Sequence, residues 1–168
     1  PVFIAAVFQR VEIVRQLSSL GANINAQDSD GFTAVNIAAL EGYPNVVKVL
    51  CELGADLNTM SLAGSSPIIA AARNGSAEII RTLASYKVDV TGISGGMITP
   101  LSMSVIKAQF EAAKTLLLLG APVTVQDLRE VKQGGNTRQL RADLQAWAAD
   151  ALVRHRVFLN TFLFGCTV

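Results

Sequence analysis

The side chains that could carry catalysis or bind a metal are few and scattered in this sequence. The only histidine, His155, stands between Arg154 and Arg156, whose charges disfavour the imidazolium ion and repel a metal cation. Neither cysteine, Cys51 or Cys166, belongs to a Cys-x-x-Cys or Cys/His cluster of the kind that holds zinc. We therefore expect no metal site, and we expect two reduced thiols that pack as small apolar side chains.

Acidic and glycine-rich stretches carry no catalytic or phosphate-binding signature either. Asp28 and Asp30 stand in a stretch typical of a turn, where aspartate stabilises the loop rather than acting as an acid or base. The Ser-Gly-Gly of residues 94–96 and the Gly-Gly-Asn of residues 134–136 lack the lysine and the spacing of a phosphate loop. No Ser-His-Asp or Cys-His arrangement stands out. The sequence predicts a protein that is not an enzyme and uses no cofactor.

Composition indicates a folded chain without a general electrostatic preference for a partner. Of its 168 residues, 51% are hydrophobic and 16% are charged, so one good core can be buried. The formal net charge of +1 gives no pull toward nucleic acid or an anionic membrane. We see no signal peptide and no apolar run of about 18 residues that could span a bilayer. We expect an intracellular fragment, cytoplasmic or nuclear, whose partners are neither nucleic acid, nor metal, nor membrane.

A period of 33 residues runs through most of the chain. The alanine pairs that begin at Ala5, Ala38 and Ala71 recur at this spacing. A second set of positions has the same spacing: Asn23, Asp56, Asp89 and Pro122. Such a fixed period indicates a stack of similar units, each of which buries its apolar face against its neighbours.

Each unit is predicted to contain two short helices followed by a loop. A hydroxyl at Thr33, Ser66 or Thr99 can cap the start of the first helix, and proline follows the last two at the first helical position. Apolar residues at helical spacing mark the second helix, as in residues 46–50. That helix ends in Leu-Gly-Ala, where glycine can adopt the left-handed conformation. The polar stretch of residues 25–31 then suits a hairpin loop.

This pattern resembles the ankyrin repeat. The copy over residues 28–58 carries the resemblance best, and the resemblance covers roughly residues 1–123. The matching residues in that copy are Asp28, Gly31, Thr33, Ala38, Ala39, Gly42, Val46, Val47, Leu50, Gly54, Ala55 and Asp56. The resemblance implies an all-α solenoid of helix-turn-helix units with connecting hairpin loops. We predict ankyrin repeats over residues 1–126, the first one truncated, and a helical C-terminal capping extension over residues 127–168.

The copies depart from the ankyrin pattern at particular positions. Where the family has a histidine after Thr-Pro-Leu, this chain has Asn36, Ile69 and Ser102, so the hydrogen bonds between repeats must be met otherwise or forgone. Lys87 replaces the glycine that ends the second helix, and holding it left-handed costs about 1 kcal/mol. Ala108 replaces a turn glycine, which makes the third copy the most degenerate.

The two ends of the stack are expected to differ. Residues 2–8 present apolar side chains before any polar cap, which suggests that further repeats precede them. At the other end we expect a short helix over residues 127–133, a Gly-Gly turn and a long helix from residue 137. One stripe of that long helix is apolar: Leu140, Leu144, Trp147, Ala151 and Phe158. The stripe either seals the end of the solenoid or offers an amphipathic surface to a partner or a membrane.

The resemblance implies a binding surface rather than a reaction. In ankyrin stacks the hairpin tips and the exposed side of each first helix line a concave groove where protein partners bind. The matching positions here are Ser29, Asp30, Phe32, Leu40, Glu41, Leu62, Ala63, Ser65, Arg73, Asn74, Ile98, Ile106 and Lys107. The five large apolar members of this set would form a strip with a charged rim, which is the composition of a binding core. The alternative is that several of them turn inward or meet repeats that are absent from this chain.

We therefore predict a non-catalytic module that binds a segment of a partner protein through this groove, as a monomer or as part of a longer chain. An alternative from another class is the regulatory or targeting portion of a larger enzyme or channel whose catalytic part is absent from this chain. A repeat scaffold accepts many unrelated partners, so the fold does not identify this one.

Overall fold

The computed structural model describes residues 1–92, 98–123, 142 and 146, and within them the chain forms eight helices and no strand. The helices are α1 (Val2–Val7), α2 (Val11–Ser19), α3 (Ala34–Glu41), α4 (Pro44–Glu52), α5 (Pro67–Asn74), α6 (Ala77–Ser85), α7 (Pro100–Ile106) and α8 (Phe110–Leu118). The predicted helix over residues 127–133 and the apolar stripe of the predicted cap lie outside the described residues, as do His155 and Cys166. The all-α prediction is confirmed.

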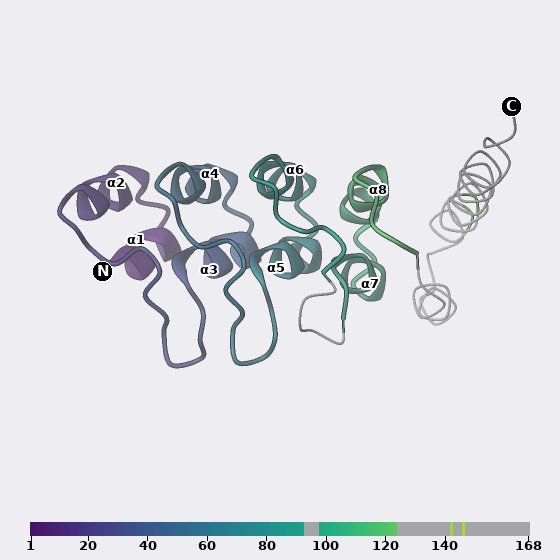
Figure 1. The fold of residues 1–168 in the computed structure, drawn as a ribbon, viewed down its shortest axis with the longest axis horizontal. Helices are drawn as coiled ribbons and strands as arrows, with labels where there is room; N and C mark the ends of the chain where they lie inside the picture. The colour runs from purple at the N-terminus through teal and green to yellow at the C-terminus, as the bar shows by residue number, and fades with distance from the viewer. Residues whose placement is uncertain (93–97, 124–141, 143–145, 147–168) are drawn as a thin grey trace, which may run out of the picture.

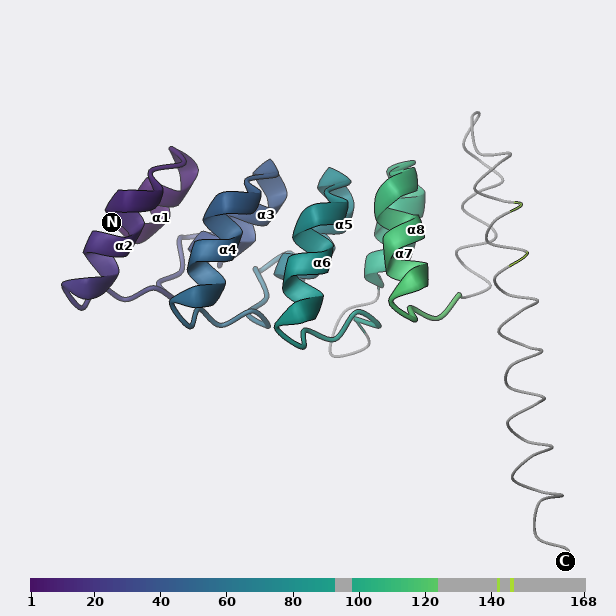
Figure 2. The same ribbon diagram turned by 90° about the horizontal axis from the view of Figure 1, so that it is seen from above.

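The helices form two rows that run along a stack of helix pairs (Figure 1). We call α1, α3, α5 and α7 the inner row and α2, α4, α6 and α8 the outer row. Contacts follow the rows, because α3 packs on α1 and α5 while α4 packs on α2 and α6. Figure 2 shows the same order from above, with each outer helix over its inner partner. The loops 20–33 and 53–66 project from the side of the inner row (Figure 1).

The core lies between the two rows and continues from pair to pair. Small side chains such as Ala38 and Ala71, both fully buried, let neighbouring inner helices approach closely. From the outer row, Leu50, Leu83 and Leu116 occupy equivalent positions and are also fully buried. The 33-residue period of the sequence is therefore the period of the core.

Side-chain capping at the start of α3, α5 and α7 follows the predicted pattern with one exception. The hydroxyls of Thr33 and Thr99 accept hydrogen bonds from the backbone N–H three residues further on. Ser66 is also an N-cap residue, and Pro67 follows it at the first helical position, but the Ser66 side chain makes no capping bond. The predicted role of Ser66 as a hydroxyl cap was therefore wrong.

Left-handed backbone recurs at the end of each outer helix. Gly21, Gly54 and Gly120 have φ values of 79°, 79° and 91°, and Lys87 at the equivalent position has φ 62°. Ala108, in the turn between α7 and α8, is likewise left-handed at φ 54°. The sequence-based expectation that Lys87 takes the conformation of a glycine is confirmed.

Asn36 makes between repeats the hydrogen bonds that the missing family histidine was expected to make. Its side chain is fully buried, and its Nδ2 donates to the carbonyl oxygens of Thr59 (3.2 Å) and Ser65 (3.1 Å) in the next loop. Its Oδ1 accepts from the backbone N–H of Thr33 at 3.2 Å. Ile69, at the equivalent position one repeat later, is 3% exposed and has no donor to offer. At the first of these junctions Asn36 supplies the hydrogen bonds between repeats. At the next junction Ile69 is buried instead, and apolar packing takes the place of those bonds.

The first helix pair exposes three large apolar side chains, Ile4, Phe8 and Ile13. Ile13 is 46% exposed, whereas Val46 and Ile79 at equivalent positions are 1% and 0% exposed. Ile4 and Phe8 are exposed by 58% and 65%. Ile4 and Phe8 belong to residues 2–8, the segment that the sequence predicted to lack a polar cap.

Candidate binding surface

The predicted binding residues come from two kinds of place in the fold. Loops 20–33 and 53–66 supply Ser29, Asp30, Phe32, Leu62, Ala63 and Ser65. The ends of the inner helices supply Leu40, Glu41, Arg73, Asn74, Ile98, Ile106 and Lys107, of which Ile98 precedes α7 and the others stand at or beside the C-terminal ends. We call these thirteen residues the candidate surface.

The tip of loop 20–33 is held by the side chain of Asp28. Its Oδ1 accepts hydrogen bonds from the backbone N–H groups of Asp30 (3.0 Å) and Phe32 (2.8 Å). In loop 53–66 the equivalent residue is Ser61, whose hydroxyl oxygen accepts from the N–H of Ser65 at 3.2 Å. Asp28 is thus a turn former, as predicted, and both loop tips are presented in a defined conformation.

Neighbouring loops are also bonded to each other. The backbone N–H of Leu62 donates to the carbonyl of Asp30 at 2.9 Å, and the N–H of Asp56 donates to Oδ1 of Asn25 at 2.9 Å. A Cβ on Gly31 would lie 2.9 Å from the Leu62 nitrogen, so glycine permits this close approach. Together with the bonds from Asn36, these contacts join loops 20–33 and 53–66 into one surface.

The apolar members of the candidate surface differ in exposure. Leu62 is 81% exposed, Ile106 is 44% exposed and Ile98 is 41% exposed. Phe32 and Leu40 are half-buried, and Leu40 packs against the core. Three of the five side chains are therefore available to a partner, while the other two belong partly to the fold.

All polar members of the candidate surface are exposed except Ser65, which is half-buried. The exposed ones are Ser29, Asp30, Glu41, Arg73, Asn74 and Lys107. Ala63 is exposed as well. Asn74 lies close to the preceding repeat, because a Cβ on Gly42 would meet its Oδ1 at 2.6 Å. Gln109 of the next repeat lies in the same way against the repeat that contains Arg73, and it donates from Nε2 to the carbonyl of Arg73 at 3.4 Å. These contacts join the C-terminal ends of neighbouring inner helices to one another.

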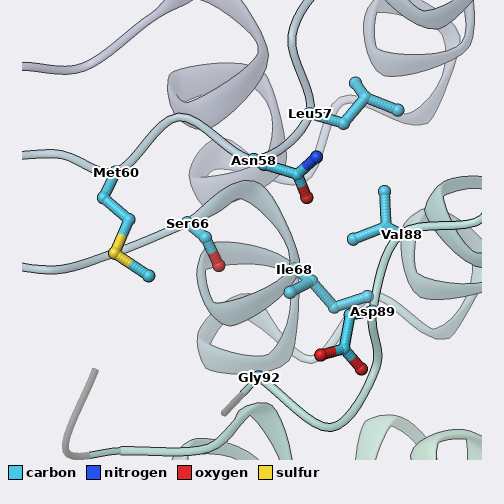
Figure 3. A pocket seen from close by; sticks show the side chains of 8 residues that line it. All are labelled: Leu57, Asn58, Met60, Ser66, Ile68, Val88, Asp89 and Gly92. Atoms are coloured by element: carbon cyan, nitrogen blue, oxygen red, sulfur yellow. The ribbon is translucent and has the colours of Figure 1, made fainter. Parts of the chain in front are cut away.

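A small hollow lies beside the candidate surface, between the loops that precede α5 and α7 (Figure 3). Its volume is about 120 Å³, and it is lined by Leu57, Asn58, Met60, Ser66, Ile68, Val88, Asp89 and Gly92. Hydrogen bonds from the hydroxyl and backbone N–H of Thr91 lower the pKa of Asp89 below its ordinary value. None of these eight residues was predicted to line a binding site. The sequence feature that could have pointed to the hollow is Ile69. It stands at the position of Asn36 in the next repeat and cannot make the hydrogen bonds by which Asn36 joins neighbouring loops.

The described residues offer little for catalysis or metal binding. Among them no group of three His, Cys, Asp or Glu side chains could hold a metal ion. Burial raises the pKa of the Cys51 thiol to about 11, which keeps it protonated and unreactive near neutral pH. None of the described helices has the length and apolar character needed to cross a bilayer.

Fold and surface together define a class of protein, a helical solenoid whose repeated helix pairs present joined loops on one side. Comparison with known families then identifies the repeat: residues 1–61 match the family described as ankyrin repeats (3 copies). No curated protein matches the chain. The predicted resemblance is confirmed, and the same helix-turn-helix unit continues to α8, beyond the matched residues. Ankyrin repeats are generally protein-protein interaction modules, and the family is typically non-catalytic.

Proposed function

We propose that this chain is a non-catalytic module that binds a segment of a partner protein through the candidate surface. The observation that carries the proposal is Leu62, an aliphatic side chain that is 81% exposed on a loop whose conformation is already fixed. A leucine in that position contributes almost nothing to the core. Ile98 and Ile106 add two further exposed aliphatic side chains to the same surface.

The fixed loops favour binding because little freedom has to be lost. Ordering a mobile side chain or loop on association costs about 0.5–1.5 kcal/mol per immobilised side chain. Here Asp28 holds one loop, and the bond between Leu62 and Asp30 joins it to the next before any partner arrives. Because the surface is already ordered, less of the free energy gained by contact with Leu62 is lost to ordering when a partner binds.

The test is affinity capture from a cell lysate with three baits: the parent chain, Leu62→Lys and Leu20→Lys. Leu20 is a matched control because it is 82% exposed and ends α2 in the outer row. We expect a protein retained by the parent and by Leu20→Lys and lost from Leu62→Lys, since removal of a central aliphatic contact costs about 2 kcal/mol, or roughly 30-fold in affinity.

Equal capture by all three baits, with unchanged helical circular dichroism, would refute the proposed surface. Leu40→Arg is a poorer variant for this purpose, because Leu40 is half-buried against the core and a charge there would disturb folding as well as binding.

A further inference from the structure

Exposed charges on the candidate surface change sign along the stack. Glu41, Asn74 and Lys107 occupy equivalent positions in three successive repeats and are all exposed. Arg73 adds a positive charge beside Asn74. The inner row therefore carries a negative charge at the end of α3 and positive charges at the ends of α5 and α7.

The fold does not account for the carboxylate of Glu41. It is the last residue of α3, where the negative end of the helix macrodipole disfavours an anion by about 0.3–1 kcal/mol. Glu52 has the same disadvantage as the last residue of α4, but Arg15 of the preceding pair lies 2.6 Å from it. Within the part of the chain that the structure describes, Glu41 forms no such ion pair.

The two basic residues, unlike Glu41, stand where their charge stabilises the helix. Arg73 stands in the last turn of α5 and Lys107 is the C-cap residue of α7, and both are places where a cation stabilises the helix. Their presence agrees with helix stability alone. Glu41 is the charge whose position lowers stability, so helix stability does not explain it.

We propose that the candidate surface binds its partner segment in one orientation, with a basic side chain of the partner at Glu41 and an acidic side chain at Lys107 and Arg73. This inference rests on the proposed function. Glu41 and Lys107 are two repeats apart, or about 20 Å if neighbouring helices are about 10 Å apart. An extended segment covers that distance in about six residues. An apolar residue of the segment beside the acidic one would lie within reach of Ile106, which is exposed next to Lys107 at the end of α7.

The experiment is selection of random peptides of about twelve residues, displayed on phage, against the immobilised full chain; that length exceeds the expected separation of the charges. Selections run in parallel on the parent, on the charge-reversed variant Glu41→Lys with Lys107→Glu, and on a control, Glu12→Lys with Lys114→Glu. The control residues are exposed on α2 and α8 of the outer row, and each double variant keeps the net charge of the parent.

We expect the parent and the control to enrich peptides with a basic and an acidic residue about six positions apart in one order. The charge-reversed variant should enrich the opposite order and bind the parent's peptides at least roughly fivefold more weakly, the size of a surface ion pair. Peptides that need Leu62 but show no order of charges, or an order unchanged by the reversal, would overturn this inference alone. A selection in which no peptide depends on Leu62 would overturn the proposed function with it.

Discussion

Lys87 allows a direct test of how much left-handed backbone costs this solenoid. Its φ of 62° lies where glycine is found at the equivalent positions of the other repeats, and its side chain is exposed. The backbone N–H of Lys87 already donates to the carbonyl of Ala84 at 2.9 Å. Lys87→Gly therefore keeps the hydrogen bond and removes only the steric conflict between Cβ and the backbone.

The expected gain is the difference between two opposing terms. A non-glycine residue in the left-handed region costs about 1–2 kcal/mol. Glycine loses more conformational freedom on folding, which costs about 0.5–1 kcal/mol. The free energy of unfolding should therefore rise by about 0.75 kcal/mol, the difference between the midpoints of the two ranges, or a few degrees in Tm for a chain of this size.

Urea unfolding followed by circular dichroism measures this change. Gly54→Ala is the matched control, because Gly54 has φ 79° and a Cβ built there meets no atom within 4 Å. That variant adds strain without a clash, so it should lower the free energy of unfolding by about 1 kcal/mol. If Lys87→Gly unfolds at the same or a lower urea concentration while Gly54→Ala is destabilised, our account of Lys87 is wrong.

Three further predictions concern two buried residues, Asn36 and Cys51. Asn36→Ala should lower the free energy of unfolding by about 2–3 kcal/mol in urea titration, because the carbonyls of Thr59 and Ser65 lose their donor. The control is Ile69→Val, which should cost about 1 kcal/mol. A cost no larger than that for Asn36→Ala would contradict the prediction. Cys51 should resist alkylation in the native state at pH 8 and react once the chain is unfolded. Because its pKa rises from 9.0 to about 11 on folding, stability should also decline as pH rises above about 9, and Cys51→Ala should flatten that decline.

The candidate surface was predictable in outline and not in detail. All of the predicted residues fall on loops 20–33 and 53–66 or beside the ends of the inner helices, since the 33-residue period places equivalent residues at equivalent points of the stack. Their exposure was not predictable. Leu40 and Ile106 are equivalent in sequence, yet Leu40 packs against the core while Ile106 is 44% exposed. Burial of a given position depends on the side chains that the neighbouring repeats place against it.

By itself, the sequence determined the features that arise from local chain chemistry. The helix pairs and the proline and threonine at helix starts follow from residue types at short range. The left-handed conformation of Lys87 follows from the 33-residue period, which places it where other copies have glycine. The helical cap over residues 127–168 stays a prediction. Only the tertiary structure decided that Asn36 joins two loops, that Glu52 is paired and Glu41 is not, and that a hollow lies beside Asp89. Each of these depends on groups about one repeat apart in the chain, which meet only when the repeats stack.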